Sequence, residues 1–318
     1  MTFSDRANVS QVIRVLLGKT SLRGASHRRW VLRRGNLETI ISCMHWKVWA
    51  IMNILHEIAE RTKERINEKK KSAPLAKIKV EAEQLVTSQD FRFEKALRAD
   101  DITFICEIKK ASPSKGIIAE DFPYLQIAKE YEAAGAAAIS VLTEPFYFKG
   151  NDQYLKEIAK TVSIPLLRKD FTVDEYMIYE AKLIGADAVL LICSILDNET
   201  LAEYIRIAHD IGLSVVVETH DENEVEAALK AGARIIGVNN RDLKTFEVDI
   251  KLSERLKPLV PEDKIFISES GIKTPEDIMR LREIKADAVL IGETLMRSED
   301  KVAKLKRLQP HASRKDGE

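Results

Sequence analysis

The stretch Ile184-Gly-Ala-Asp-Ala-Val-Leu-Leu-Ile192 carries the two signals that decide the fold. Gly185 stands where a helix would end, because helices commonly close on a glycine in the left-handed conformation. The run Ala188–Ile192 is apolar at every position, which is typical of a strand buried on both faces of a parallel sheet. The chain is therefore predicted to pass here from a helix directly into a buried strand.

The same transition recurs along the chain. Gly135, Gly212 and Gly232 also precede apolar runs, and Ala-Gly-Ala surrounds both the first and the third of them. Eight apolar runs begin 21 to 34 residues apart, which leaves room for a strand, a loop, a helix of three to four turns and a second loop. The runs are Ile102–Ile108, Ala136–Leu142, Ile164–Leu167, Ala188–Ile192, Ser214–Val217, Ile235–Val238, Ile265–Ile267 and Ala288–Ile291.

Eight strand–helix units in about 200 residues predict a closed (β/α)8 TIM barrel of the α/β class. A doubly wound open sheet is the alternative, but no Gly-x-Gly-x-x-Gly motif follows any of the predicted strands. Helix start signals between the runs support the barrel, since each pairs an N-cap with an acid in the first turn. These signals are Thr172 with Glu175, Asp221 with Glu224, and Thr274-Pro275 with Asp277.

A helical prelude precedes the barrel. The spacing of its apolar residues predicts an amphipathic helix over Ile54–Lys71 that ends before Pro74. A second helix is predicted over about Leu75–Leu85, and a third apolar face lies near Phe91. We therefore expect one domain over residues 52–318, with its prelude at 54–98, preceded by a separate segment of residues 1–51. The apolar prelude residues are Ile54, Leu55, Ile58, Ala59, Ile66, Phe91, Phe93, Ala96 and Leu97.

The overall composition is that of a globular chain. The 318 residues include 45% apolar and 31% charged side chains, which excludes global disorder. The three cysteines, Cys43, Cys106 and Cys193, form no CxxC pair, so neither a disulfide framework nor a zinc knuckle is expected. Cys106 and Cys193 are interpreted as small core residues within apolar strands. The formal net charge of zero conceals two unlike parts of the chain.

Residues 1–51 contain nine Lys/Arg and two Asp/Glu, a net charge of +7 that the rest of the chain balances. The segment resembles a nucleic-acid-binding arm with arginines on phosphates, or an Arg-rich, acid-poor transit peptide. A membrane anchor at Ile40–Met52 is disfavoured because the run is short and interrupted by His45 and Lys47. We favour the interpretation that the segment is a disordered or spurious extension, since Met52 opens a self-contained helix.

Ionisable residues gather directly after the apolar runs, where the active site of a barrel lies. Glu107 and Lys109 are two apart on a strand, so both side chains point to one face. Lys169 and Glu218 end two other strands, and in a site of low dielectric such groups acquire pKa values suited to proton transfer. A structural ion pair could explain Glu107 and Lys109 alone, but it explains all four residues less well.

The last two strand ends suit a phosphate group. Glu269-Ser270-Gly271 and Gly292-Glu293 could bind it through backbone N–H groups, although tight turns alone also favour glycine. His220 is the only histidine at a strand end, and we interpret it as a polar residue at a helix entry. No Asp/His cluster has metal-ligand spacing. We therefore expect metal-free acid/base chemistry, without a cofactor, on an anionic phosphorylated substrate.

Six motifs at the strand ends closely resemble the indole-3-glycerol phosphate synthase family. The resemblance extends from Met52 to about Leu308 and includes the helical prelude, whereas no motif covers residues 1–51. The motifs are Glu-Ile-Lys-Lys-Ala-Ser-Pro-Ser-Lys-Gly (107–116), Leu-Arg-Lys-Asp-Phe (167–171), Val-Glu-Thr-His (217–220), Gly-Val-Asn-Asn-Arg-Asp-Leu (237–243), Ser-Glu-Ser-Gly-Ile (268–272) and Ile-Gly-Glu-Thr-Leu-Met (291–296).

The resemblance implies closure of 1-(2-carboxyphenylamino)-1-deoxyribulose 5-phosphate to indole-3-glycerol phosphate, with loss of carbon dioxide and water, in tryptophan biosynthesis. Lys169 matches a general acid that protonates the substrate carbonyl, and we expect a lowered pKa for it as a lysine desolvated among cations. Glu218 matches a residue that stabilises the cationic ring intermediate and serves the acid/base steps. The matches of Glu107 and Lys109 assist ring closure and dehydration.

The resemblance assigns the remaining residues to binding. Asn239 matches an amide that orients Glu107 and the substrate, and Arg241 and Ser112 match positions near the carboxylate that leaves. The chain departs from some family members at Ala111, where they have a third lysine, and at Glu293, where they have a serine. The expected phosphate-binding positions are Glu269, Ser270, Gly271, Gly292 and Glu293.

The resemblance also implies a cytoplasmic monomer or weak homodimer, without nucleic acid or membrane partners, near other enzymes of tryptophan synthesis. A phosphoribosylanthranilate isomerase is the nearest rival, but its Cys and Asp acid/base pair has no counterpart at the strand ends. A regulatory nucleic-acid-binding protein with a degenerate barrel is disfavoured because Glu107, Lys109, Lys169 and Glu218 are all present.

Overall fold

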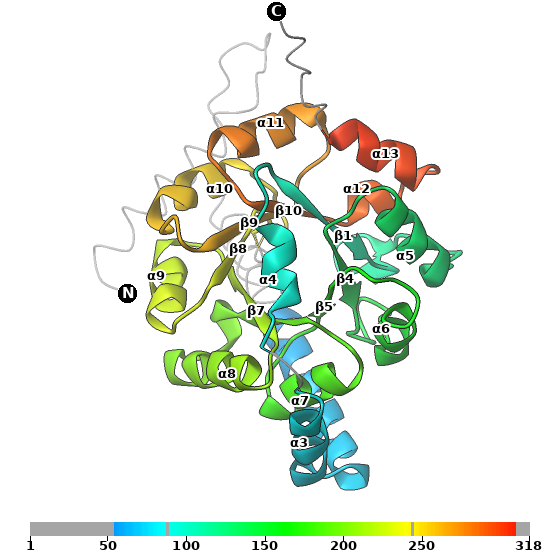
Figure 1. The fold of residues 1–318 in the computed structure, drawn as a ribbon, viewed down its shortest axis with the longest axis vertical. Coiled ribbons are helices and arrows are strands. Elements are labelled where there is room, and N and C mark those ends of the chain that lie inside the picture. Colours follow the sequence, from blue (N-terminus) through cyan, green and yellow to red (C-terminus); the bar gives the residue numbers. More distant parts are fainter. Residues whose placement is uncertain (1–53, 87–88, 243–244, 310–318) are drawn as a thin grey trace, which may run out of the picture. The chain divides into compact units, whose positions relative to one another are not determined.

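The computed structural model describes residues 54–86, 89–242 and 245–309. Eight parallel strands close into a barrel in the order β1-β10-β9-β8-β7-β6-β5-β4, which confirms the predicted TIM barrel (Figure 1). The predictions for residues 1–51 and for a start at Met52 lie outside the described residues. The strands are β1 (Thr103–Ile108), β4 (Ala138–Leu142), β5 (Leu166–Lys169), β6 (Ala188–Ile192), β7 (Ser214–Thr219), β8 (Ile235–Asn239), β9 (Ile265–Glu269) and β10 (Ala288–Ile291).

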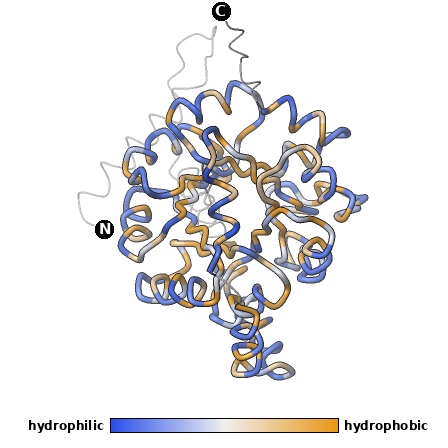
Figure 2. The backbone as a smooth tube through the Cα atoms, in the orientation of Figure 1, coloured by the Kyte–Doolittle hydropathy of each residue, from blue (hydrophilic) through white to orange (hydrophobic). Residues whose placement is uncertain are grey.

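Helices surround the barrel, with their polar faces outward and the apolar strands inside (Figures 1 and 2). The predicted prelude is confirmed as a helix over residues 54–72 followed by α3 (Leu75–Gln84) and α4 (Arg92–Leu97). A two-stranded hairpin, β2 (Ala111–Ser112) with β3 (Gly116–Ile117), lies in the loop after β1. The other helices are α5 (Tyr124–Ala133), α6 (Asp152–Ile158), α7 (Glu175–Leu183), α8 (Asn198–Asp210), α9 (Glu222–Lys230), α10 (Lys251–Leu256), α11 (Pro275–Glu283), α12 (Glu293–Met296) and α13 (Lys301–Leu308), with 3-10 turns η1 (Cys193–Ile195) and η2 (Lys257–Leu259).

The helix boundaries follow local signals with one correction. Asp221 caps α9, and Thr274 and Asp277 form a reciprocal capping box on α11, as predicted. For α7, however, the cap is Asp174, which accepts a hydrogen bond from the Tyr176 N–H. The prediction of Thr172 was wrong because a carboxylate two residues later meets the free N–H groups at the helix start. Gly185 has φ +92°, as expected for a glycine that closes a helix.

The core has two layers. One fills the space between the strands and the surrounding helices, and the other fills the barrel interior. Phe93 and Leu97 of α4 are fully buried in the interior layer, where they pack with strand residues such as Ala188 and Ile265. The third apolar face of the prelude therefore helps to fill the barrel, and the site must be at the opposite ends of the strands.

Several strands extend beyond the predicted apolar runs. β5 includes Lys169, β7 includes Glu218 and Thr219, and β8 and β9 end at Asn239 and Glu269. These polar residues continue the backbone pairing, and most are buried at the mouth of the barrel. The predicted runs were too short because the side chains change from apolar to polar before the strand ends. Among the described residues, no helix is both long and apolar enough to cross a membrane.

Candidate active site

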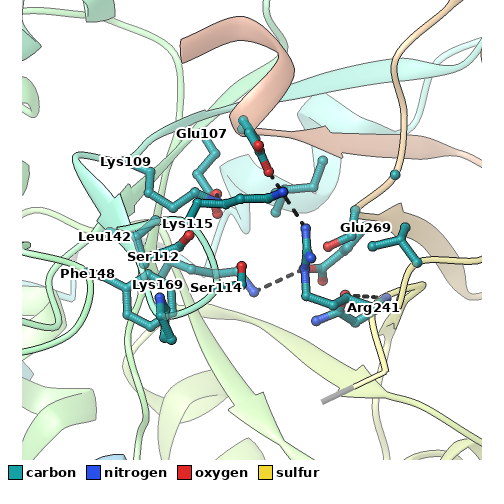
Figure 3. Close-up of a pocket in the computed structure, with 18 of the residues that line it drawn as sticks. Glu107, Lys109, Ser112, Ser114, Lys115, Leu142, Phe148, Lys169, Arg241 and Glu269 are labelled. Atoms are coloured by element: carbon teal, nitrogen blue, oxygen red, sulfur yellow. Dashed lines mark hydrogen bonds and ion pairs between the residues drawn. The ribbon is translucent and has the colours of Figure 1, made fainter. Parts of the chain in front are cut away.

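A cavity of about 510 Å³ opens at the carboxyl ends of the strands (Figure 3). Its volume is within the usual range for small-molecule sites. The structure brings all of the predicted site residues to its lining, although they come from the ends of six strands and the loops that follow them. These residues are Glu107, Lys109, Ser112, Lys169, Glu218, Asn239, Arg241, Glu269, Ser270, Gly271, Gly292 and Glu293.

Lys169 lies at the centre of an inner ion cluster, which we define as Lys169, Glu218 and Glu269. Its Nζ is 2.8 Å from Glu218 Oε2 and 3.0 Å from Glu269 Oε2. The three residues lie at or next to the carboxyl ends of β5, β7 and β9, so strand geometry alone converges them on the mouth. All three side chains are at most 12% exposed, and their charges therefore interact with little screening by water.

The charges around Lys169 contradict the expected lowering of its pKa. Burial alone would lower the pKa of Lys169, but the carboxylates of Glu218, Glu269 and Glu107 raise it above its ordinary value. The predicted lowering was wrong because carboxylates rather than cations surround this ammonium. Lys169 is therefore held in its protonated form.

The two carboxylates of the inner cluster are not equivalent. Burial raises the pKa of Glu269 to about 7, a shift that Lys169 opposes and the charge of Glu218 reinforces. Burial would also raise the pKa of Glu218, but Lys169 and His220 lower it below its ordinary value. Groups whose pKa values are driven apart in one site can act as acid and base. Glu269 was predicted at the phosphate end, but it contacts Lys169 instead.

Asn239 is also placed differently from the expectation. Its Nδ2 donates to Glu218 Oε1 over 3.1 Å, while its Oδ1 accepts from the backbone N–H of Arg241. The amide therefore orients Glu218 rather than Glu107, because β7 and β8 are hydrogen-bonded neighbours. This contact joins the Glu218 carboxylate to the loop that bears Arg241.

Glu107 and Lys109 form a second ion pair, with Lys109 Nζ 2.5 Å from Glu107 Oε1. Gly292 lies against this pair, since a Cβ there would contact Glu107 Oε1 and come within 3.2 Å of Lys109 Nζ. A larger residue at this strand end would therefore displace the Glu107 carboxylate from its present position.

The backbone turn at Ser270-Gly271 has an unusual conformation, with φ +68° and +85°. A buried network missed by the sequence interpretation supports it. Asn240 Nδ2 donates to the Ser270 carbonyl over 3.1 Å and to Ser268 Oγ over 2.9 Å, while Ser253 donates to Asn240 Oδ1. The only sequence signal for this role was the second of two adjacent amides after β8.

Charged side chains surround Glu293 at the start of α12. Glu293 Oε1 is 3.1 Å from Arg297 Nε, and its Oε2 is 3.9 Å from Arg241 Nη2. The two arginines partly offset the negative charge of Glu293, which replaces the serine of some family members.

Apolar side chains from the prelude and from a loop form one wall of the cavity. Ile54, Leu55 and Ile58 of the prelude line it, together with Phe148 from the loop after β4. That loop is fixed by Glu144, which accepts the N–H groups of residues 146, 147 and 148. Glu144 thus serves the loop backbone, although its position at a strand end resembled that of a catalytic residue.

An outer ion cluster attaches the prelude helix beside the site; we define it as Arg65, Lys69, Asp152, Arg168, Asp170 and Glu180. Arg65 Nη2 is 3.0 and 2.9 Å from the two oxygens of Asp170, and Lys69 Nζ is 2.5 Å from Asp152 and 2.6 Å from Glu180. Asp170 directly follows Lys169 in the chain. The prelude therefore supports the backbone that carries the central lysine.

The two cysteines within the described residues, Cys106 and Cys193, differ in their surroundings. Cys106 is fully buried in β1, as predicted, but Cys193 is half-buried in the turn η1 rather than within a strand. Burial raises the pKa of Cys193 to about 12, so its thiol stays protonated.

Within the described part of the chain, no group of three or more His, Cys, Asp or Glu side chains is arranged to hold a metal ion.

Comparisons with known proteins identify one family. The family model "Indole-3-glycerol phosphate synthase" matches residues 55–308. The chain is 63% identical over 259 residues to an indole-3-glycerol phosphate synthase of Ruminiclostridium cellulolyticum, covering 81% of this chain and 100% of that protein. It is 52% identical over 267 residues to one of Lachnoclostridium phytofermentans, covering 80% and 98%.

Solved structures support the fold. A 3-hexulose-6-phosphate synthase from Salmonella typhimurium aligns with a TM-score of 0.55 at 17% identity, covering 65% of this chain and 96% of that chain. A tryptophan synthase α-subunit from Pyrococcus furiosus aligns with a TM-score of 0.51 at 15% identity, covering 65% and 98%. On the family model and the close relatives, this chain belongs to the indole-3-glycerol phosphate synthase family.

Proposed function

We propose that this chain closes 1-(2-carboxyphenylamino)-1-deoxyribulose 5-phosphate to indole-3-glycerol phosphate, with loss of carbon dioxide and water, in tryptophan biosynthesis. The observation that carries the proposal is a protonated lysine held between two carboxylates in a cavity that also contains Arg241. That arrangement offers an acid, a base and a cation for an anionic substrate, and family membership identifies the reaction.

In the first step, the ring carbon that bears the carboxylate attacks the ketone carbon. The carbonyl oxygen takes a proton from Lys169 and becomes a hydroxyl, while the positive charge moves to the ring nitrogen as an iminium. A lysine of raised pKa is a weak acid, but an alkoxide is a much stronger base than an amine. Proton transfer therefore becomes favourable as the carbon–carbon bond forms.

The iminium is then neutralised by decarboxylation, because the electrons of the breaking carbon–carboxylate bond return to the ring. The anionic Glu218 is suited to stabilising the cation before this happens. In the last step the hydroxyl leaves as water with an added proton, and a carbon-bound proton goes to a base. We assign the ion pair of Glu107 and Lys109 to this dehydration. Lys109 can supply the proton to the leaving hydroxyl, and Glu107 can assist the elimination.

Substrate binding uses the two ends of the cavity. We assign the phosphate to the backbone N–H groups of Ser270, Gly271, Gly292 and Glu293, and the carboxylate to Arg241 and Ser112. Holding both anions of a flexible molecule brings its reacting carbons together and reduces the entropic cost of closure. The apolar wall formed by Ile58, Leu142 and Phe148 offers a surface for the aromatic ring.

The direct test is the appearance of indole fluorescence when the purified chain is given the substrate, with carbon dioxide release measured in parallel. We expect turnover both by the full chain and by a variant that starts at Met52. Equal rates would support the interpretation that residues 1–51 are not part of the working enzyme. Absence of product from both proteins, each correctly folded, would contradict the proposed function.

We also propose that the enzyme works as a cytoplasmic monomer or weak homodimer without nucleic acid or membrane partners. The acidic composition of residues 52–318 supports this proposal, since their net charge is −7. Light scattering after gel filtration would measure the oligomeric state. A salt-sensitive gel shift that is lost on deleting residues 1–51 would contradict the absence of a nucleic acid partner.

A further inference from the structure

His220 lies between two carboxylates at the edge of the active site. It directly follows β7 and precedes Asp221, the N-cap of α9. Its Nδ1 is 3.1 Å from Glu224 Oε2, and its backbone N–H donates to the same oxygen over 2.7 Å. Its Nε2 faces Glu218 Oε1 at 3.4 Å. The ring is thus fixed on one side by Glu224 and directed to Glu218 on the other.

Glu218 has a different neighbour on each oxygen. Oε2 accepts from Lys169, whereas Oε1 accepts from Asn239 and faces His220. A carboxylate held from both ends cannot rotate freely, so these contacts determine which lone pairs remain available to a substrate. Lys169 is itself held by Glu269, and Asn239 by the backbone of Arg241. Of these three neighbours of Glu218, His220 is the one tied to a residue outside the cavity lining, Glu224.

The charges around His220 favour an imidazolium. Glu218 of β7 and Glu224 of α9 contact the ring, and Asp221 lies beside it in the chain. Two groups from packed elements lie near these carboxylates. Cys193 of η1 donates to the Glu224 carbonyl, and Lys169 of β5 contacts the other oxygen of Glu218, Oε2. Burial alone would lower the pKa of His220, but the two carboxylates raise it to about 10. By contrast, burial, together with Arg234, lowers the pKa of His209 to about 4.

We propose that His220 is a positioning residue for the reaction: a cation fixed on Glu224 that holds the Glu218 carboxylate in the orientation it needs toward Lys169 and the substrate. The proposal rests on the proposed function, and it extends the polar site from the cavity lining to the first turn of α9. It also gives the histidine at this helix entry a role that its position in the sequence did not indicate.

The proposal predicts a pH effect with a definite sign. The pKa of Glu218 is held below its ordinary value partly by His220, so removing the imidazolium raises it. Glu218 then becomes protonated at a higher pH. The acid limb of the kcat/KM profile should therefore move upward, whereas a purely structural role for His220 would leave that limb in place.

The test compares His220→Ala and His220→Gln with the matched variant His209→Gln. We expect His220→Ala to lower kcat by about tenfold to hundredfold, the range expected for losing one buried ionic contact to a carboxylate. KM should change little, and the acid limb should shift upward. His220→Gln keeps a donor without the charge, so it should recover part of kcat but retain the shifted limb. His209→Gln, on α8, should behave as wild type.

An unchanged kcat and pH profile in folded His220→Ala would overturn the proposal, while normal wild-type turnover would still support the enzyme function. NMR titration of the wild-type histidines gives an independent readout that needs neither substrate nor a stable His220→Ala protein. The His220 resonance is assigned by its loss in His220→Gln. It should report an imidazolium at pH 8, where His209 is neutral; a neutral His220 ring at that pH would also overturn the proposal.

Discussion

Arg168 and Lys169 are consecutive cations on β5, yet they belong to opposite regions of the molecule. Successive side chains of a strand point to opposite faces, so Arg168 enters the outer ion cluster and Lys169 the inner one. Arg168 donates to Asp152, Glu180 and the Met177 carbonyl, each within 2.8 Å. Both side chains are nearly inaccessible to solvent, so burial alone does not distinguish their roles.

The two clusters differ in charge balance. The outer cluster pairs three cations with three carboxylates and joins β5, α6, α7 and the prelude helix. The inner cluster has one lysine for two carboxylates, and Glu269 Oε1 is buried without a hydrogen-bond partner. A balanced network stabilises one arrangement of the chain, whereas an unbalanced one beside a cavity leaves groups available for proton transfer. We therefore interpret the outer cluster as a structural region and the inner cluster as the chemical one.

The largest expected effect is in the inner cluster. Lys169→Ala should lower kcat by about 10²–10⁴-fold, the usual contribution of a general acid, while the barrel stays folded. Steady-state and single-turnover fluorescence assays would measure the loss, with circular dichroism as the control for folding. A folded variant with near-normal kcat would rule out Lys169 as the acid.

The second prediction concerns the outer cluster, where we expect a loss of stability rather than a loss of activity. Arg168→Met should destabilise the protein by about 3–5 kcal/mol, because Asp152 and Glu180 lose a buried partner. The folded fraction should keep a kcat close to that of wild type. Urea denaturation measures the stability, and a large fall in kcat without a loss of stability would erase the proposed distinction between the clusters.

Arg65 tests the connection between the two regions. Arg65→Met should cost about 1.5–3 kcal/mol of stability, because Asp170 loses a charge-assisted partner whose Nη2 donates to both carboxylate oxygens. We also expect a smaller fall in kcat than for Lys169→Ala, since Asp170 is the next residue after Lys169. The two measurements should be made at the same temperature. Lost stability with an unchanged kcat would mean that the prelude supports the fold alone.

The last prediction is the pH dependence of stability due to Glu269. Its pKa is raised from 4.5 to about 7, so between these values the unfolded chain releases a proton that the folded chain keeps. This group's contribution to stability is present at low pH and is lost as the pH rises through about 7. The Tm of wild type relative to Glu269→Gln should therefore fall between pH 5 and pH 8. A constant difference would mean that Glu269 is not protonated in this range.

Some parts of the site were predictable because they depend on local pattern. Lys109, Lys169 and Glu218 follow apolar runs, Glu107 lies near the end of one, and the parallel barrel converges the ends of those runs. The contacts of Asn239, the support from Asn240 and the cap at Asp174 were not predictable in the same way. Each depends on which of several nearby polar groups lies within hydrogen-bond distance, and periodicity carries no such information.

The sequence by itself determined the eight strand–helix units, the prelude helices and the identity of the residues at the mouth, because burial and turn chemistry are encoded at short range. Only the tertiary structure decided how the charges pair. Lys169 lies among carboxylates from β7 and β9, which follow it by 49 and 100 residues, and its pKa is raised rather than lowered. Coulomb energy depends on distances of a few ångströms in a medium of low dielectric, and those distances exist only in the closed barrel.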